Sequence, residues 1–145
     1  MTSRVLATLL MLLAAPVAAA PPVPPAECPR GMRASWRGLC DAANRGEPAA
    51  LMTLGAWRVL GINGPRDPAE GERLIALAAG AGHVRARYAL GVLLARREPD
   101  AARAHWRAAA AEGCIGAAIM LLREEEADGA VPDEALRARV ASLAA

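Results

Sequence analysis

Hydrophobic and polar positions recur in blocks along this chain. Three segments, beginning at Gly46, Gly82 and Gly113, share one pattern: a small residue, a large apolar residue two places later, then a leucine. They start 36 and 31 residues apart, and the segment before each one also repeats and ends in glycine. A period of this length predicts an array of paired α-helices.

Helix signals divide each repeat into two helices. In the first unit they predict helices at 48–60 and 68–80, because Asp67 can cap the second helix and Pro68 suits its first turn. The second unit has a shorter turn, and Pro99 begins its second helix. A third pair is predicted at 114–127 and 132–144. Its first helix ends in Arg123-Glu124-Glu125-Glu126, a polar end typical of a terminal repeat.

Two glycines occupy the same phase inside the first helix of their units. Glycine inside a helix costs about 1 kcal/mol relative to alanine, so the recurrence of Gly55 and Gly91 predicts that a neighbouring helix comes too close for a side chain. A chance small residue in an alanine-rich chain is the less favoured alternative.

These residues carry a family resemblance over roughly residues 32–143. Ala86, Tyr88, Leu90 and Gly91 are followed by His105-Trp106 and then by Ala109-Ala110-x-x-Gly113. Here the chain resembles the Sel-one-like repeat (SLR) family, a relative of the tetratricopeptide repeats. Arg58 and Leu122 depart from the family pattern. The resemblance implies an all-α fold, a right-handed α/α-solenoid of two full repeats with a leading half and a degenerate closing pair. The repeat-packing residues that it implies are Ala50, Leu54, Gly55, Ala86, Tyr88, Leu90, Gly91, Trp106, Ala117 and Leu121.

The amino terminus has the layout of a secretory signal peptide. Arg4 precedes an apolar run, Pro16 breaks it, and small residues follow. We predict a signal peptide at 1–19, cleaved after Ala19 in preference to Ala20, a proline-rich linker at 20–30 and the folded domain at 31–145. The apolar run is too short for a membrane anchor, so a periplasmic or secreted bacterial protein is expected.

Three cysteines in an exported chain indicate one disulfide and one free thiol. Cys28 and Cys40 are the favoured pair, because their bond would fold the proline-rich segment back onto the first helix. The competing pair, Cys40 with Cys114, would join elements more than two repeats apart. Cys114 is expected to stay buried and free.

Composition and motifs argue against several classes of function. The 17 basic residues, all arginine, face 15 acids for a net charge of +2, and nucleic-acid binders show a stronger basic excess. No serine lies in a nucleophile motif, and His83 and His105 share no ligand spacing with the cysteines. We expect no enzyme activity, cofactor or metal.

A binding surface is what remains. We expect the concave side of the array to be formed by Leu51, Thr53, Trp57, Arg58, Arg85, Arg87, Ala89, Ala118 and Met120. The predicted function is an exported protein–protein interaction module, an adaptor, scaffold or regulator of an envelope partner, and the chain is expected to be monomeric. A periplasmic protein that binds cell-wall or carbohydrate ligands is the alternative. Whether the arginine-rich middle repeat recognises a partner or only solubilises the helices is left open.

Overall fold

Helices form the whole of the regular structure that can be described. The computed structural model describes residues 26, 28, 33–129, 131 and 133–144, and within them the chain is all-α, as predicted, with no strand. The predicted signal peptide at 1–19 lies outside the described residues, as does the linker at 20–30 apart from Ala26 and Cys28. The helices are α1 (Ala34–Asn44), α2 (Pro48–Leu60), α3 (Pro68–Gly80), α4 (Val84–Leu94), α5 (Pro99–Ala111), α6 (Ile115–Ala127) and α7 (Glu134–Ala144).

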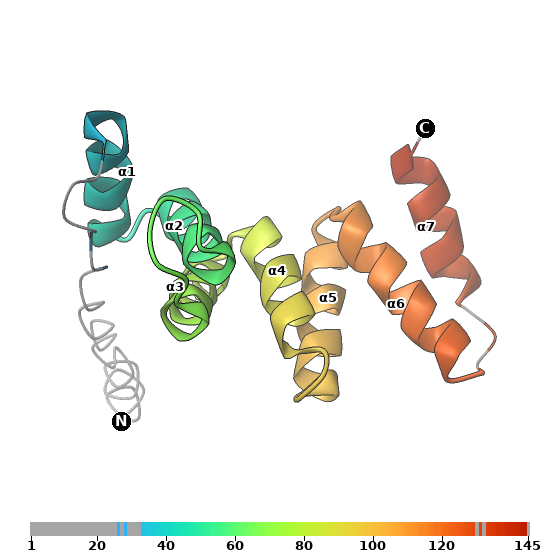
Figure 1. Ribbon diagram of the computed structural model, residues 1–145. Coiled ribbons are helices and arrows are strands. Elements are labelled where there is room, and N and C mark those ends of the chain that lie inside the picture. The colour runs from blue at the N-terminus through green and yellow to red at the C-terminus, as the bar shows by residue number, and fades with distance from the viewer. Residues whose placement is uncertain (1–25, 27, 29–32, 130, 132, 145) are drawn as a thin grey trace, which may run out of the picture.

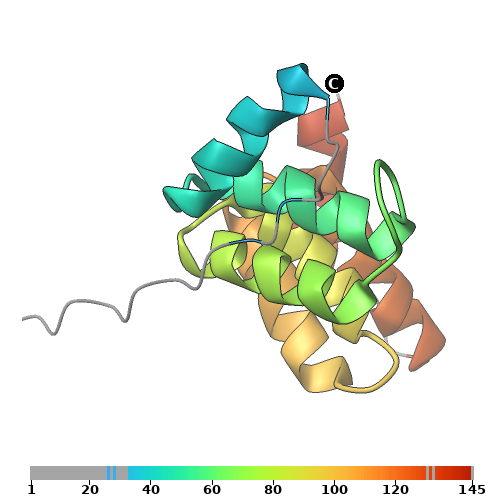
Figure 2. The same ribbon diagram turned by 60° about the vertical axis from the view of Figure 1, so that its left-hand side comes forward.

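The helices follow one another in a row, with α1 at one end and α7 at the other (Figure 1). Each helix packs mainly against its neighbours in the chain, most extensively within the pairs α2/α3 and α4/α5. Figure 2, in which the α1 end comes forward, shows α2 and α3 in front of the later helices. The core therefore runs along the row as a series of helix–helix interfaces.

Local sequence signals place the helix ends. Proline occupies the first turn of α2, α3 and α5, where its missing N–H costs no hydrogen bond. The Asp67 carboxylate accepts a hydrogen bond of 3.1 Å from the Glu70 N–H and caps α3. Helices α2 and α3 have the predicted bounds. The closing helices begin slightly later than predicted, and Cys114 precedes α6 with an extended backbone.

Small side chains fill the helix interfaces. Many of the buried residues are alanines, and the largest fully buried side chains are Trp106, Leu54, Leu74 and Cys40. No polar or charged side chain is buried among the described residues. Because alanine lets helix backbones approach closely, the core gains its contacts from proximity as much as from large side chains.

The two glycines that the sequence singled out, Gly55 and Gly91, lie at close approaches between helices, as predicted. A Cβ built on Gly55 would lie 2.8 Å from the Gly71 carbonyl oxygen and 2.7 Å from Ile75 Cγ1. One built on Gly91 would lie 2.6 Å from Trp106 Cδ1. Real Cβ atoms do not come this close, so a side chain at either position would push α3 away from α2 or the Trp106 indole out of its place.

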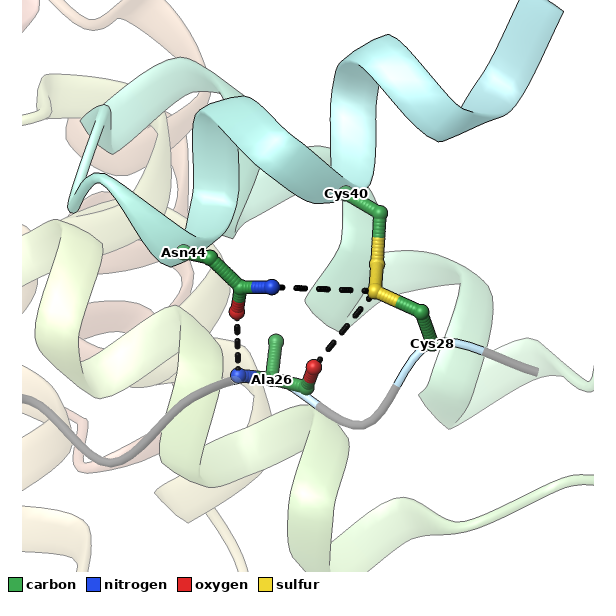
Figure 3. The surroundings of a disulfide bond; sticks show 4 residues. All are labelled: Ala26, Cys28, Cys40 and Asn44. Carbon is green, nitrogen blue, oxygen red and sulfur yellow. Dashed lines mark hydrogen bonds between the residues drawn. A yellow bond between two sulfur atoms is a disulfide. The ribbon is translucent and has the colours of Figure 1, made fainter. Parts of the chain in front are cut away.

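A disulfide between Cys28 and Cys40 attaches the segment before α1 to that helix, which confirms the predicted pair. Their Cα atoms are 6.1 Å apart, within the usual range. The Asn44 amide accepts a 2.6 Å hydrogen bond from the Ala26 N–H and donates to Cys28 Sγ at 3.8 Å (Figure 3). Ala26 is buried. The disulfide and Asn44 therefore hold this segment against the core.

Thiol labelling tests this attachment. In native protein without reductant we expect an alkylating agent to react at Cys114 alone, because Cys28 and Cys40 are bonded. The sequence predicted that Cys114 is buried, but the structure shows it half-buried. Its reaction should therefore be slow in the native protein and faster after unfolding. Mass spectrometry counts the adducts. Labelling of Cys28 in the native, unreduced protein would show that the disulfide does not form.

Candidate functional site

An apolar groove runs between α2 and α4. Its volume is about 240 Å³. Leu60 and Val92 leave 65% and 45% of their surface exposed beside it. The groove is lined by Met52, Ala56, Val59 and Leu60 of α2, Ile75 of α3, and Tyr88, Ala89, Val92 and Leu93 of α4.

Helix packing fixes the shape of this groove. The close contact of α2 with α3 at Gly55 and Gly71 holds Ile75 between the two walls. On the α4 side, Gly116 of α6 leaves room for the Tyr88 ring, because a Cβ there would lie 3.3 Å from Tyr88 Cζ. The Tyr88 carbonyl oxygen also accepts a 3.3 Å hydrogen bond from Trp106 Nε1. The groove is therefore supported by neighbouring helices on both sides.

The residues predicted for a concave face do not share one surface. Ala89 lines the groove. Leu51 is 2% exposed and Ala118 is fully buried, so neither can contact a partner, and these two predictions are wrong. Met120 is half-buried and packs against the core. Thr53 is half-buried, and its hydroxyl donates to the Ala49 carbonyl oxygen at 2.8 Å.

Trp57 and Arg58 lie away from the groove lining. The Trp57 ring packs on Trp36 of α1, with centroids 5.1 Å apart, so it joins α2 to α1. Arg58 is half-buried. The backbone carbonyl of Arg58 accepts a 2.8 Å hydrogen bond from the Asp67 N–H and closes the turn between α2 and α3.

The two arginines predicted on α4 have different surroundings. Arg85 is exposed, whereas Arg87 is half-buried and forms an ion pair with Glu112 after α5. Arg87 Nε also lies 3.4 Å from the Ala79 carbonyl oxygen and donates to it. Arg87 therefore ties three helices together, while Arg85 remains available at the surface.

The predicted repeat-packing residues lie inside the interfaces. Nine of the ten are buried, and Tyr88, which lines the groove, is half-buried. Leu60 and Val92 were not among the residues predicted for the binding surface. Their signal was present, because Ala56 and Leu60, like Tyr88 and Val92, are four residues apart on one helix face.

A second hollow, between α5 and α6, is polar. Its volume is about 320 Å³ and its lining includes Arg107, Leu121 and Glu125. Arg103 Nη2 lies 2.7 Å from Asp100 Oδ1. Its Nη1 lies 3.7 Å from Glu124 Oε2 and 3.6 Å from Asp128 Oδ2. The hydrogen bond that Arg103 donates to the Asp100 carboxylate raises the pKa of Arg103 despite a smaller opposing effect of burial, and attraction to the carboxylates adds to it. The lining holds four carboxylates and two arginines, and three of the carboxylates already pair with Arg103.

The described residues contain no group of three or more histidine, cysteine or acidic side chains placed to hold a metal ion. His83 instead caps α4, because its Nδ1 accepts a 3.2 Å hydrogen bond from the Ala86 N–H at the start of that helix. No helix within the described ranges is both long and apolar enough to cross a membrane.

Comparisons of this chain with protein-family models, with curated proteins and with solved structures found no match.

Proposed function

We propose that this chain is an exported interaction module that holds a segment of a protein partner in the groove between α2 and α4. The observation that carries the proposal is the groove itself: apolar side chains line it, and Leu60 and Val92 stay exposed at its edge. Such exposure costs free energy unless a partner covers it. The chain acts as an adaptor, scaffold or regulator of an envelope protein and not as an enzyme.

Size and composition favour a protein partner over a carbohydrate. A groove of about 240 Å³ is smaller than the roughly 300–1,000 Å³ typical of pockets for small molecules and suits a few side chains. Carbohydrate sites use exposed aromatic platforms. Within the described part of the chain, Trp36 and Trp57 pack on each other, Trp106 is buried and Tyr88 is half-buried.

The same proposal assigns the chain to Sel-one-like repeats. The array is a right-handed α/α-solenoid with α2/α3 and α4/α5 as full repeats, α1 as the leading half and α6/α7 as the closing pair. Its support is the equivalent role of Gly55 and Gly91, each of which lets the first helix of a pair touch the second. Each helix contacts mainly its chain neighbours, which suits a monomeric repeat array.

Export is the third part of the proposal. A signal peptide at 1–19 would direct the chain to the periplasm or outside the cell. The Cys28–Cys40 disulfide supports this location, because disulfides persist mainly in oxidising compartments.

Site-specific photo-crosslinking in the native cell envelope tests the groove. With a photoreactive amino acid at Leu60 or Val92, we expect an adduct with a partner protein. Exposed positions outside the groove, Ala76 of α3 and Ala104 of α5, are the controls and should give none. The adduct at Leu60 should disappear when Val92→Glu places a charge in the groove. Adducts that form equally at all four positions, or that survive Val92→Glu, would rule out binding at the groove.

A further inference from the structure

The charges around the groove differ from those of the rest of the surface. Helices α2 and α4, which form its walls, contain arginines and no aspartate or glutamate. Acids are instead concentrated near the carboxyl-terminal end, with three consecutive glutamates in α6. Helices α2 and α4 therefore bring positive and no negative charge to the surroundings of the apolar groove.

Two of the arginines on and after α4 are already neutralised. Arg87 pairs with Glu112, and Arg97 pairs with Glu72 and lies 3.5 Å from Glu98. The hydrogen bond with Glu72 and the attraction to its carboxylate are the main causes that raise the pKa of Arg97. Each of these guanidinium groups already forms an ion pair with a carboxylate of this chain, so a partner's carboxylate would have to compete for it.

Arg85 and Arg96 differ from these two. Both are exposed, and neither forms an ion pair or a side-chain hydrogen bond within the described part of the chain. Arg85 lies seven residues before Val92, on the same side of α4. Arg96 lies four residues after Val92 in the turn that follows Leu94, where Ala95 keeps a helical backbone and the Leu94 carbonyl oxygen accepts a 2.8 Å hydrogen bond from the Glu98 N–H. We call Arg85, Val92 and Arg96 the α4 ridge. It borders the groove through Val92.

We propose that the groove selects an acidic segment of the partner, in which an apolar side chain lies between two carboxylates. This inference rests on the proposed function and specifies its ligand. Arg85 and Arg96 are about 16 Å apart along the helix axis, at 1.5 Å per residue. An extended chain spans that distance in about five residues. The apolar side chain enters beside Val92, and each carboxylate pairs with one arginine.

A random library of 12-residue peptides, displayed on phage and selected on the disulfide-intact protein, tests the ligand class. We expect enrichment of peptides with two acids roughly four to six residues apart and Leu, Ile, Val or Phe between them. Fluorescence polarisation then gives the Kd of the enriched peptides. The double variant Arg85→Gln/Arg96→Gln should bind them about tenfold more weakly at low salt, and the difference should shrink at high salt because exposed charges are screened.

Matched variants separate this inference from the proposed function. Arg107→Gln/Arg137→Gln removes two other exposed arginines, on α5 and α7, and should leave the Kd unchanged. Val92→Ser should weaken binding by removing the apolar contact. If Val92→Ser weakens binding but Arg85→Gln/Arg96→Gln does not, the groove binds without charge selection: this inference fails and the proposed function stands. If neither variant changes the Kd, the peptides bind elsewhere and both fail.

Two further outcomes would overturn the ligand assignment, and the second would overturn the proposed function as well. Selection that yields no acid enrichment, or no binding peptide, contradicts it directly. The second outcome is measured by sedimentation of the protein without peptide. A dimer that Val92→Glu dissociates would show that a second copy of the chain covers the groove. A monomer at every concentration tested is the expected result.

Discussion

Alanine in place of Gly71 is expected to destabilise the protein by about 2–3 kcal/mol, although alanine is the better helix former. A Cβ at this position would lie 2.6 Å from the Gly55 carbonyl oxygen and 2.8 Å from the Val59 backbone nitrogen. Both obstacles are backbone atoms of α2, so no side-chain rotation can remove them. The two helices must separate, and the groove that depends on their packing should lose its shape.

Gly38 provides a matched control. It lies inside α1, and a Cβ there would meet no atom within 4 Å. Gly38→Ala should therefore leave stability unchanged or raise it by up to about 1 kcal/mol through helix propensity. Urea unfolding followed by circular dichroism at 222 nm measures both variants. Equal stability of Gly71→Ala and Gly38→Ala would mean that α2 and α3 do not meet at Gly71.

The sequence predicted the helices well because their ends depend on local chemistry. Proline at the first turn of α2 and α3 and Asp67 at the cap of α3 act within a few residues, so their meaning does not depend on tertiary contacts. The contact between helices at Gly55 could be predicted because the next repeat also has a glycine at the equivalent position, Gly91. The contact at Gly71 could not be predicted, since no other repeat has a glycine at the position equivalent to Gly71.

The binding surface was predicted less well, for a geometric reason. The residues predicted for the concave side alternate along the helix with the packing residues, so they include Leu51 with Thr53 and Arg85 with Arg87. Residues two apart in a helix point in nearly opposite directions, so such pairs cannot share a face. The structure divides both pairs: Leu51 is buried while Thr53 is not, and Arg87 turns to Glu112 while Arg85 stays exposed.

Charge pairing was also beyond the sequence. The ion pairs Arg87–Glu112 and Arg97–Glu72 each join residues 25 positions apart, and nothing in the local pattern distinguishes them from the unpaired Arg85 and Arg96. Only the arrangement of helices shows which arginines are neutralised. The arginines of the middle repeat therefore fall into two groups: Arg85 and Arg96 are exposed and, among the described residues, unpaired, whereas Arg87 and Arg97 pair with acids outside α4.

The contact between Gly91 and Trp106 can be tested by enlarging residue 91 of α4 and shortening residue 106 of α5, separately and together, and measuring the free energy of unfolding. Trp106 is 1% exposed, and its indole occupies the space that a side chain at residue 91 would need. Gly91→Leu alone should cost about 1–3 kcal/mol by overpacking. Trp106→Ala alone should cost about 3–5 kcal/mol by leaving a cavity.

Combined, these two substitutions should cost at least about 1 kcal/mol less than the sum of the single losses, because the leucine fills part of the space that the indole leaves. Urea unfolding of the wild type, both single variants and the double variant gives this coupling energy. Gly91→Ala replaces the leucine variant if Gly91→Leu does not fold, and it should still be destabilising, since even a Cβ meets the indole. Additive losses would show that residue 91 and Trp106 do not compete for one space, and the close approach of α4 and α5 would then need another cause.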